Sequence, residues 1–255
     1  QGDPGYSRFY VSLKDELMVR FGSERLEGIF AQLGDEQIES KMVTKAIESA
    51  QQRVEGQNFD IRKSLLQYDD VLRQQREVMY EQRDYVLNNE DVHTVVYEMF
   101  TRVHTRLVAR YADPKSGKVD GAKLLDGLKV LGCPEDMVTL AEIDGKNAKD
   151  VTALCLERDW KFYNDKIEDV KENYLPFEKT IVLKNMDRRW IDHIDSMDKL
   201  RSGIHLRSYA QSQPLQAYVE EGYAMFEEMM ESIAREVVFF ANRMNIEVRH
   251  REYKK

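Results

Sequence analysis

Apolar side chains recur every three or four residues over most of this 255-residue chain, and the longest such run lies in its first third. Residues 38–88 contain no Pro and a single Gly, Gly56. Apolar residues follow the helical spacing at Val43, Ile47, Ala50, Val54, Ile61, Leu65, Tyr68, Leu72, Met79 and Val86. This pattern predicts one continuous helix, about 70 Å long at 1.5 Å per residue. Because that length exceeds the width of a small domain, a scaffold helix is favoured over an isolated coiled-coil rod.

A second apolar line runs along the same predicted helix. It consists of Phe59, Leu66, Val71, Val78 and Tyr85. A helix with two apolar lines is expected to pack on two faces, so we expect both lines to be covered.

Helical spacing continues through the rest of the chain. It predicts a helix over residues 91–111, a break at 113–117, and then short helices in a small module up to about residue 150. Two further long helices are predicted at 152–200, with a kink or break at Pro176, and at 214–244, where Pro214 suits the first helical turn. Their short linker predicts an antiparallel hairpin.

The N-terminal residues differ from this helical pattern. Residues 1–5 are rich in turn-forming Gly and Pro. Residues 7–13 alternate and favour a short β-strand, whose sheet must lie elsewhere because a lone strand is unstable. A short helix that Gly22 ends and another over 24–33 are expected next. Since Gln1 is not Met and precedes a turn, we expect this chain to be part of a longer protein.

The composition supports a helical protein and excludes some function classes. Charged residues make up 33% of the chain, against about 25% in a typical protein, and the apolar content of 42% is too high for disorder. The net charge of −8 argues against nucleic acid as the main partner. No run of about 18 apolar residues and no signal peptide are present, so we expect a cytoplasmic location.

Known catalytic and metal-binding motifs are absent from the sequence. It contains no GxxxxGK[ST], HExxH, GxSxG or CxxC. Cys133 and Cys155 are expected to be two buried or idle thiols, and the five His residues are too dispersed to predict a metal site. Asp70, next to Asp69, is expected to be solvated or salt-bridged. For His193, a position on the helix surface is favoured over a proton relay with its acidic neighbours.

The predicted hairpin tip, residues 201–211, has an unusual composition. It contains Arg201, His205 and Arg207 and no acidic residue, with Ile204 and Tyr209 among these basic groups. Two interpretations remain open for the apolar residues: they fold under a neighbouring domain, or they contact an extended polypeptide. An aromatic ring with a hydroxyl suits the second, because it can bind peptide backbone without sequence preference.

Several stretches together resemble the C-terminal half of the SecA family, the motor ATPases of bacterial preprotein translocation. The resemblance covers nearly the whole chain and is weak only at about 112–156. It rests on Gln1-Gly2-Asp3-Pro4-Gly5, Arg8-Phe9-Tyr10, Glu39-Ser40-Lys41-Met42, Arg53-Val54-Glu55-Gly56, Asn58-Phe59-Asp60-Ile61-Arg62-Lys63, Leu66-Gln67-Tyr68-Asp69-Asp70-Val71-Leu72, Gln74-Gln75-Arg76, Trp190-Ile191-Asp192-His193 and Gly203-Ile204-His205-Leu206-Arg207-Ser208-Tyr209-Ala210-Gln211.

The resemblance implies a mainly α fold: a long scaffold helix, packed helical subdomains, an antiparallel two-helix finger and a short N-terminal β remnant. The domains it implies are the end of a second RecA-like motor domain (1–22), a helical scaffold (23–88), a helical wing (89–156), the two-helix finger with the scaffold continuation (157–245) and a basic tail (246–255).

The resemblance also implies a function. This chain would transmit nucleotide-driven motion to preprotein at the SecY channel, without a catalytic site, cofactor or metal of its own. Tyr209, Arg207, Arg201, Ile204 and His205 would contact preprotein or channel.

Trp190 would couple the finger to the ATPase. The intact protein would be a protein-translocating ATPase that binds ATP and Mg²⁺. Its partners would be SecYEG, unfolded preprotein, the rest of the SecA motor, a possible second copy and the anionic inner face of the plasma membrane, where it associates peripherally. Two alternatives are a non-catalytic helical adaptor and the accessory region of a nucleic-acid helicase.

Overall fold

The described part of the chain is dominated by helices, and it forms two compact units, Gln1–Asp69 and Asp70–Lys255. No β-strand occurs among the described residues, although isolated bridges join Ala112 to Val119 and Lys118 to Asn147. The predicted mainly α fold is therefore confirmed. The computed structural model describes residues 2, 4–6, 15–21, 41–168, 170, 173–207 and 214–243.

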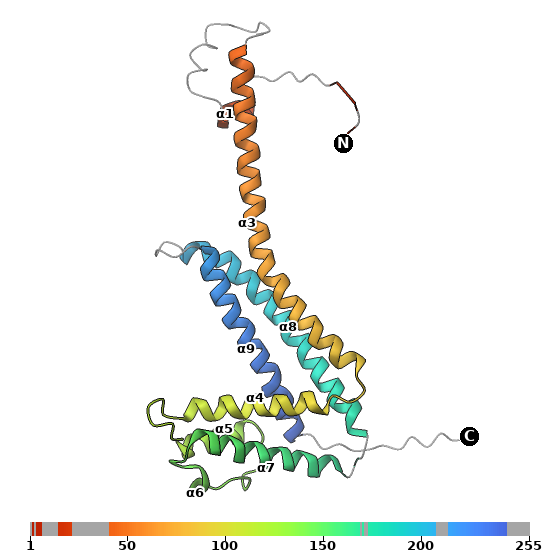
Figure 1. The fold of residues 1–255 in the computed structure, drawn as a ribbon, viewed down its shortest axis with the longest axis vertical. Coiled ribbons are helices and arrows are strands. Elements are labelled where there is room, and N and C mark those ends of the chain that lie inside the picture. The colour runs from red at the N-terminus through yellow and green to blue at the C-terminus, as the bar shows by residue number, and fades with distance from the viewer. Residues whose placement is uncertain are drawn as a thin grey trace, which may run out of the picture. The chain divides into compact units, whose positions relative to one another are not determined.

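The long predicted helix is present as α3, Lys41–Asn88, an unbroken run of 48 residues (Figure 1). At 1.5 Å per residue it is about 70 Å long. It ends where the sequence predicted, while the predicted start at residue 38 lies outside the described residues. The first unit also contains α1, Glu16–Phe21, with Met18 buried. The predicted strand over 7–13 and the predicted helix over 24–33 lie outside the described residues.

The second apolar line of α3 is not covered as the sequence predicted. Phe59 is 59% exposed and Leu66 is 69% exposed, and Val78 and Tyr85 are exposed as well. Val71 is half-buried. The prediction of a second packed face is thus wrong for this chain, because an apolar line shows what a helix can bury but not which segment covers it.

The second unit contains the remaining helices and a long, continuous core. Figure 1 shows α4, α5 and α7 together, and α9 reaching α4 from the other side. The most deeply buried core positions include Phe100 on α4, Tyr163 on α7, Val182 on α8 and Val237 on α9. The helices are α4 His93–Tyr111, α5 Gly121–Val130, α6 Leu140–Ile143, α7 Ala148–Glu168, α8 Tyr174–Arg207 and α9 Pro214–Arg243.

The predicted breaks between these helices are confirmed. After α4, the Asp113 carboxylate accepts backbone hydrogen bonds from Lys115 (2.6 Å) and Ser116 (3.3 Å), and Gly117 takes the positive φ that the turn requires. Between α7 and α8 the chain breaks just before Pro176, which lies in the first turn of α8. Pro is tolerated there because the first backbone N–H groups have no helical partner.

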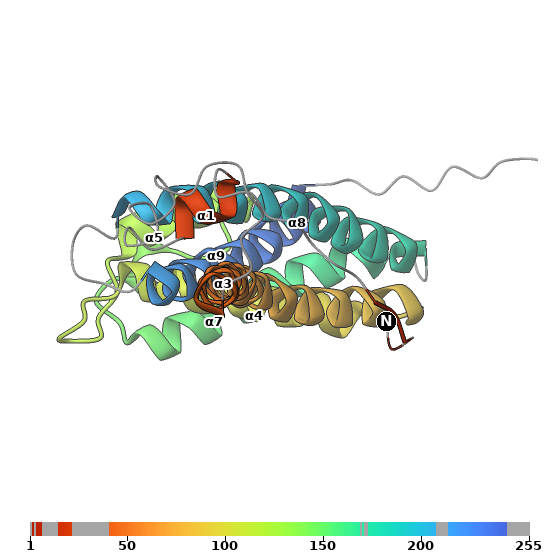
Figure 2. The same ribbon diagram turned by 90° about the horizontal axis from the view of Figure 1, so that it is seen from above.

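Three segments of the second unit form an antiparallel bundle. Along α3, Gln75, Arg83 and the Leu87 carbonyl contact His193, Asp187 and Lys179 respectively, so α8 runs opposite to α3. Figures 1 and 2 show this part of α3, in gold, beside α8. α9 returns antiparallel to α8. Among the described residues, none of these helices combines the length and apolar character that crossing a bilayer requires.

Candidate functional site on the α8–α9 hairpin

The α8–α9 hairpin is held by a continuous buried seam. Met186, Trp190 and Met197 are buried on α8, and Phe226 and Ile233 are buried on α9. The two helices, of 34 and 30 residues, pack closely near Gly222, where an added Cβ would lie 2.8 Å from the Met197 methyl. The seam passes through Tyr218, which is buried, and not through its neighbour Val219, which is 43% exposed.

The hairpin tip remains helical further than the sequence predicted. α8 continues to Arg207, so residues 201–207 are helix rather than loop. The buried face explains the extension, since Met197, Leu200 and Ile204 follow the same three- and four-residue spacing and are all buried. Gly203 is tolerated within this turn, at a modest cost in helix propensity.

The residues predicted to make contacts have different environments. Ile204 is only 1% exposed, so it packs inside the hairpin and offers almost no surface to a partner. Arg201 is half-buried, with an interaction of its own. His205 and Arg207 belong to the last turn of α8. Tyr209 lies outside the described residues.

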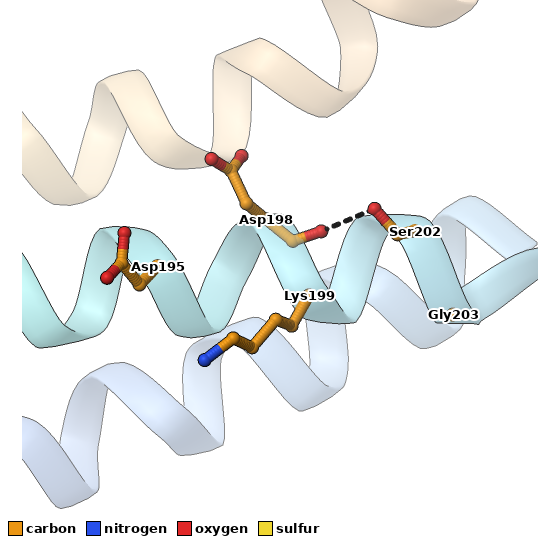
Figure 3. A pocket seen from close by; sticks show the side chains of 5 residues that line it. All are labelled: Asp195, Asp198, Lys199, Ser202 and Gly203. Atoms are coloured by element: carbon orange, nitrogen blue, oxygen red, sulfur yellow. Dashed lines mark hydrogen bonds between the residues drawn. The ribbon is translucent and has the colours of Figure 1, made fainter.

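A shallow, open hollow lies on α8 just before the tip. It is lined by Asp195, Asp198, Lys199, Ser202 and Gly203 (Figure 3). Figure 3 shows Asp198 and Lys199 pointing in opposite directions, and the Ser202 hydroxyl donating a 2.9 Å hydrogen bond to the Asp198 carbonyl. With two carboxylates and one ammonium, this part of the helix is acidic rather than basic.

A buried polar contact joins all three helices of the bundle. The Gln75 amide on α3 contacts Nε2 of His193 on α8 through its oxygen, at 2.8 Å. Its nitrogen donates a 3.0 Å hydrogen bond to the Gly222 carbonyl on α9. Trp190, predicted as a coupling residue, is buried next to this contact, with its ring 5.7 Å from the His193 ring.

The predicted surface position of His193 is therefore wrong. His193 is buried, and burial lowers the pKa of its imidazole. Its neighbours Asp192 and Asp195 are exposed, so no proton relay forms. Helix geometry accounts for this, because position 193 lies three residues after Trp190 and four before Met197, on the same face.

Two models of known protein families match nearly the whole chain. Residues 37–245 match the family described as the SecA Wing and Scaffold domain, and residues 1–37 match the SecA P-loop domain. The first match alone covers well over half of the chain.

The chain belongs to the SecA family.

Ion pairs between helices support the hairpin of this SecA chain. Arg83 on α3 pairs with Asp187 on α8 at 2.7 Å. Arg189 on α8 pairs with Glu236 on α9. The charge of Glu236 on α9 is thus neutralised from within the chain. These pairs are part-exposed, so each is expected to fix the relative orientation of the two helices it joins more than to add stability.

Another polar cluster joins the start of α4 to α7 and α8. His93 Nδ1 lies 2.7 Å from a Glu178 carboxylate oxygen, and Nε2 lies 3.2 Å from the Asn164 amide oxygen. Tyr163 donates a 2.9 Å hydrogen bond to the same Glu178 oxygen. The hydrogen bond with Glu178 raises the pKa of His93, although burial opposes it.

Asp70 on α3 forms a salt bridge, as expected. Its partner is Arg73, at 2.6 Å, and this interaction lowers the pKa of Asp70.

Sequence reasoning did not anticipate one group of side chains in this SecA protein. His104, Cys133 and Asp159 offer ligand atoms that all lie within 4.8 Å of one another, and all three residues are buried. The sequence predicted dispersed His and two buried thiols. The thiols are buried and unpaired as predicted, but the fold brings one of them to a His and an Asp from distant positions. No local spacing could have revealed this group.

Proposed function

We propose that this SecA chain transmits the motion of an ATP-driven motor to unfolded preprotein at the SecYEG channel. In this proposal α3 is the transmitting element, and the α8–α9 hairpin is the element that acts on the preprotein. ATP and Mg²⁺ binding is assigned to the motor part of the intact protein, and the match of residues 1–37 to the SecA P-loop domain supports this assignment.

The observation that carries the proposal is the buried contact of Gln75 with both helices of the hairpin. One α3 side chain holds a His193 ring nitrogen and the Gly222 carbonyl at hydrogen-bonding distance. A shift of α3 that separated these groups would leave buried polar atoms without hydrogen-bond partners, which raises the free energy of the folded chain. The hairpin is therefore expected to follow this part of α3, since closely packed elements move as units.

The working end of the hairpin is assigned to Arg201, His205, Arg207 and Tyr209. Cationic side chains with an aromatic ring suit an extended polypeptide, whose backbone carbonyls accept hydrogen bonds whatever its sequence. Ile204 is assigned a supporting role, because it is buried. Trp190 is assigned to coupling, because it packs beside the Gln75 contact.

The same proposal extends to the surroundings of the protein. The SecA match supports SecYEG and preproteins as partners in general. We further propose peripheral association with the anionic inner face of the plasma membrane, to which the basic tail at 246–255 would contribute, and association with the rest of the motor and with a second copy.

The decisive experiment is Tyr209→Ala in the full-length protein, with Tyr223→Ala as the matched control. Tyr223 is 64% exposed on α9, so both variants remove a tyrosine ring from the same hairpin. We expect Tyr209→Ala to lower preprotein translocation into SecYEG vesicles at least tenfold while ATP hydrolysis persists, and Tyr223→Ala to leave both unchanged. Normal translocation by Tyr209→Ala would refute the assignment of the tip. Absence of ATP hydrolysis in the full-length wild type would instead favour a helical adaptor.

A further inference from the structure

Four buried polar side chains from different parts of the second unit meet in its interior. His104 comes from α4, Cys133 follows α5, Asp159 lies on α7, and Asn242 is near the end of α9. His104 and Asp159 have no exposed surface, and the other two are nearly as buried. Polar groups this deep in a core are normally paired with hydrogen-bond partners.

Their atoms converge on one point. His104 Nε2 lies 3.1 Å from Asp159 Oδ2. The Asn242 amide nitrogen donates to Asp159 Oδ2 at 3.2 Å and to Cys133 Sγ at 3.6 Å. His104, Cys133 and Asp159 each offer one ligand atom, and these three atoms lie within 4.8 Å of one another.

Three atoms of this cluster have no hydrogen-bond partner: His104 Nε2, Asp159 Oδ1 and Asn242 Oδ1. The other ring nitrogen of His104, Nδ1, lies 2.9 Å from the Phe100 carbonyl. A carbonyl only accepts, so Nδ1 carries the proton and donates it. In the neutral ring, Nε2 then directs a lone pair into the cluster. Metal-binding His residues are held in this way, with the second ring nitrogen bonded to a carbonyl.

We propose that His104 Nε2, Cys133 Sγ and a carboxylate oxygen of Asp159 bind one structural Zn²⁺ ion. Zinc takes imidazole, thiolate and carboxylate ligands together. At Zn–N and Zn–S bond lengths, neighbouring ligand atoms lie on the order of 3.5 Å apart, so the three atoms need only a small inward shift. A half-turn of the Asn242 amide would bring its unpaired oxygen into the fourth position.

Charge balance supports a divalent ion in this buried position. On binding, the Cys133 thiol loses its proton to solvent, and the metal–sulfur bond replaces the S–H bond. The thiolate and the Asp159 carboxylate together cancel the two positive charges of the ion, so the occupied site carries no net charge. Without a metal the thiol stays protonated, because burial and the Asp159 carboxylate raise its pKa.

The burial of the ligands also indicates what the ion does and when it binds. A site without exposed ligands is structural, because it leaves no open position for a substrate. The ion would fasten α4 and α7 to the end of α9. Since a folded chain offers no path to these atoms, metal uptake is expected to accompany folding.

The test uses this chain, unfolded with denaturant and chelator and then refolded under reducing conditions with Co²⁺ in place of Zn²⁺. We expect about one Co²⁺ per chain, visible d–d bands of a tetrahedral ion and a near-ultraviolet sulfur-to-cobalt charge-transfer band. Chain purified without chelator should contain about one zinc by elemental analysis. A refolded wild-type chain with neither bound cobalt nor the charge-transfer band would overturn the proposal.

Two matched variants identify the ligand. Cys133→Ala should lose the charge-transfer band and at least tenfold in cobalt affinity, and Cys155→Ala, which removes the other buried thiol, should keep both. Zinc present during refolding should raise the melting temperature of the wild type and Cys155→Ala but not that of Cys133→Ala. If Cys133→Ala does not fold, Cys133→Ser replaces it with the same expectations. An unchanged charge-transfer band in the Cys133 variant would overturn the assignment of this thiol.

Discussion

Gly121, the first residue of α5, is the position where one added methyl group should cost most. A Cβ there would lie 2.8 Å from Asp144 Cβ and 2.9 Å from its Cα. The Gly121 N–H also donates to the Asp144 carboxylate at 3.0 Å, so the two segments cannot separate without losing this bond. We predict that Gly121→Ala lowers the free energy of unfolding by about 1–3 kcal/mol, measured by urea titration of helical circular dichroism.

Gly203→Ala is the control for this substitution within the same unit. Gly203 is helical, and no atom lies within 4 Å of the Cβ that Ala would add. Helix propensity alone then applies, and the change should stabilise the unit by up to about 1 kcal/mol. Equal effects of the two substitutions would show that the close approach at Asp144 does not govern stability.

His93 makes stability depend on pH. Both ring nitrogens face oxygen acceptors, on Glu178 and Asn164, so the charged imidazolium satisfies both contacts and its pKa lies above the ordinary 6.5. A raised folded-state pKa contributes stability that is fully present below 6.5 and is lost as pH rises through the folded value. We predict that melting temperature falls over this window, and that His93→Gln flattens the fall in scans between about pH 5 and pH 8. An equally steep fall in the variant would assign the pH dependence to other groups.

The buried polar residues mark the limit of prediction at this scale. Trp190 lies on the packed face of its helix, in agreement with the apolar spacing around it. His193 and Gln75 occupy the same kind of position, but a polar residue on a packed face is stable only when a distant partner satisfies it. That partner is on another helix, and the sequence does not show which residues will meet.

At the scale of the elements, long regular spacing was the reliable signal. α3 and α9 end within a residue of their predicted ends, because no Pro lies inside either helix after its first residue and the apolar spacing continues past Gly56 and Gly222. The predicted end of α8 was too early, because the polar and charged residues at 201–207 obscured the apolar spacing that Leu200 and Ile204 continue. Apolar spacing also failed to show that the Phe59–Tyr85 line of α3 would be exposed. Apolar spacing shows which face of a helix is apolar. Whether that face is buried depends on which other segments pack against it.

At the scale of the whole molecule, the two units differ in how much core they contain. All buried members of the continuous apolar core lie between Met79 and Ala241. Fold class and helix order followed from the sequence because they depend on local spacing. Preprotein and channel contact did not follow from spacing, because they rest on the SecA resemblance, and Tyr209 remains a proposed contact.

The distribution of core residues predicts that the second unit folds without the first. Removal of residues 1–69 deletes no member of the apolar core, and it leaves the Gln75, Arg83 and Lys179 contacts between α3 and α8 in place. We predict that a chain of residues 70–255 unfolds cooperatively, with a melting temperature within a few degrees of the full chain's main transition. Calorimetry of both chains measures the two melting temperatures and the cooperativity of unfolding.

A matched deletion of residues 214–255 should abolish the transition, because α9 supplies Ile233, Val237 and Ala241 to the core. If the 70–255 chain instead melted without cooperativity, the core of the second unit would require the first unit to form, and independent folding would be refuted.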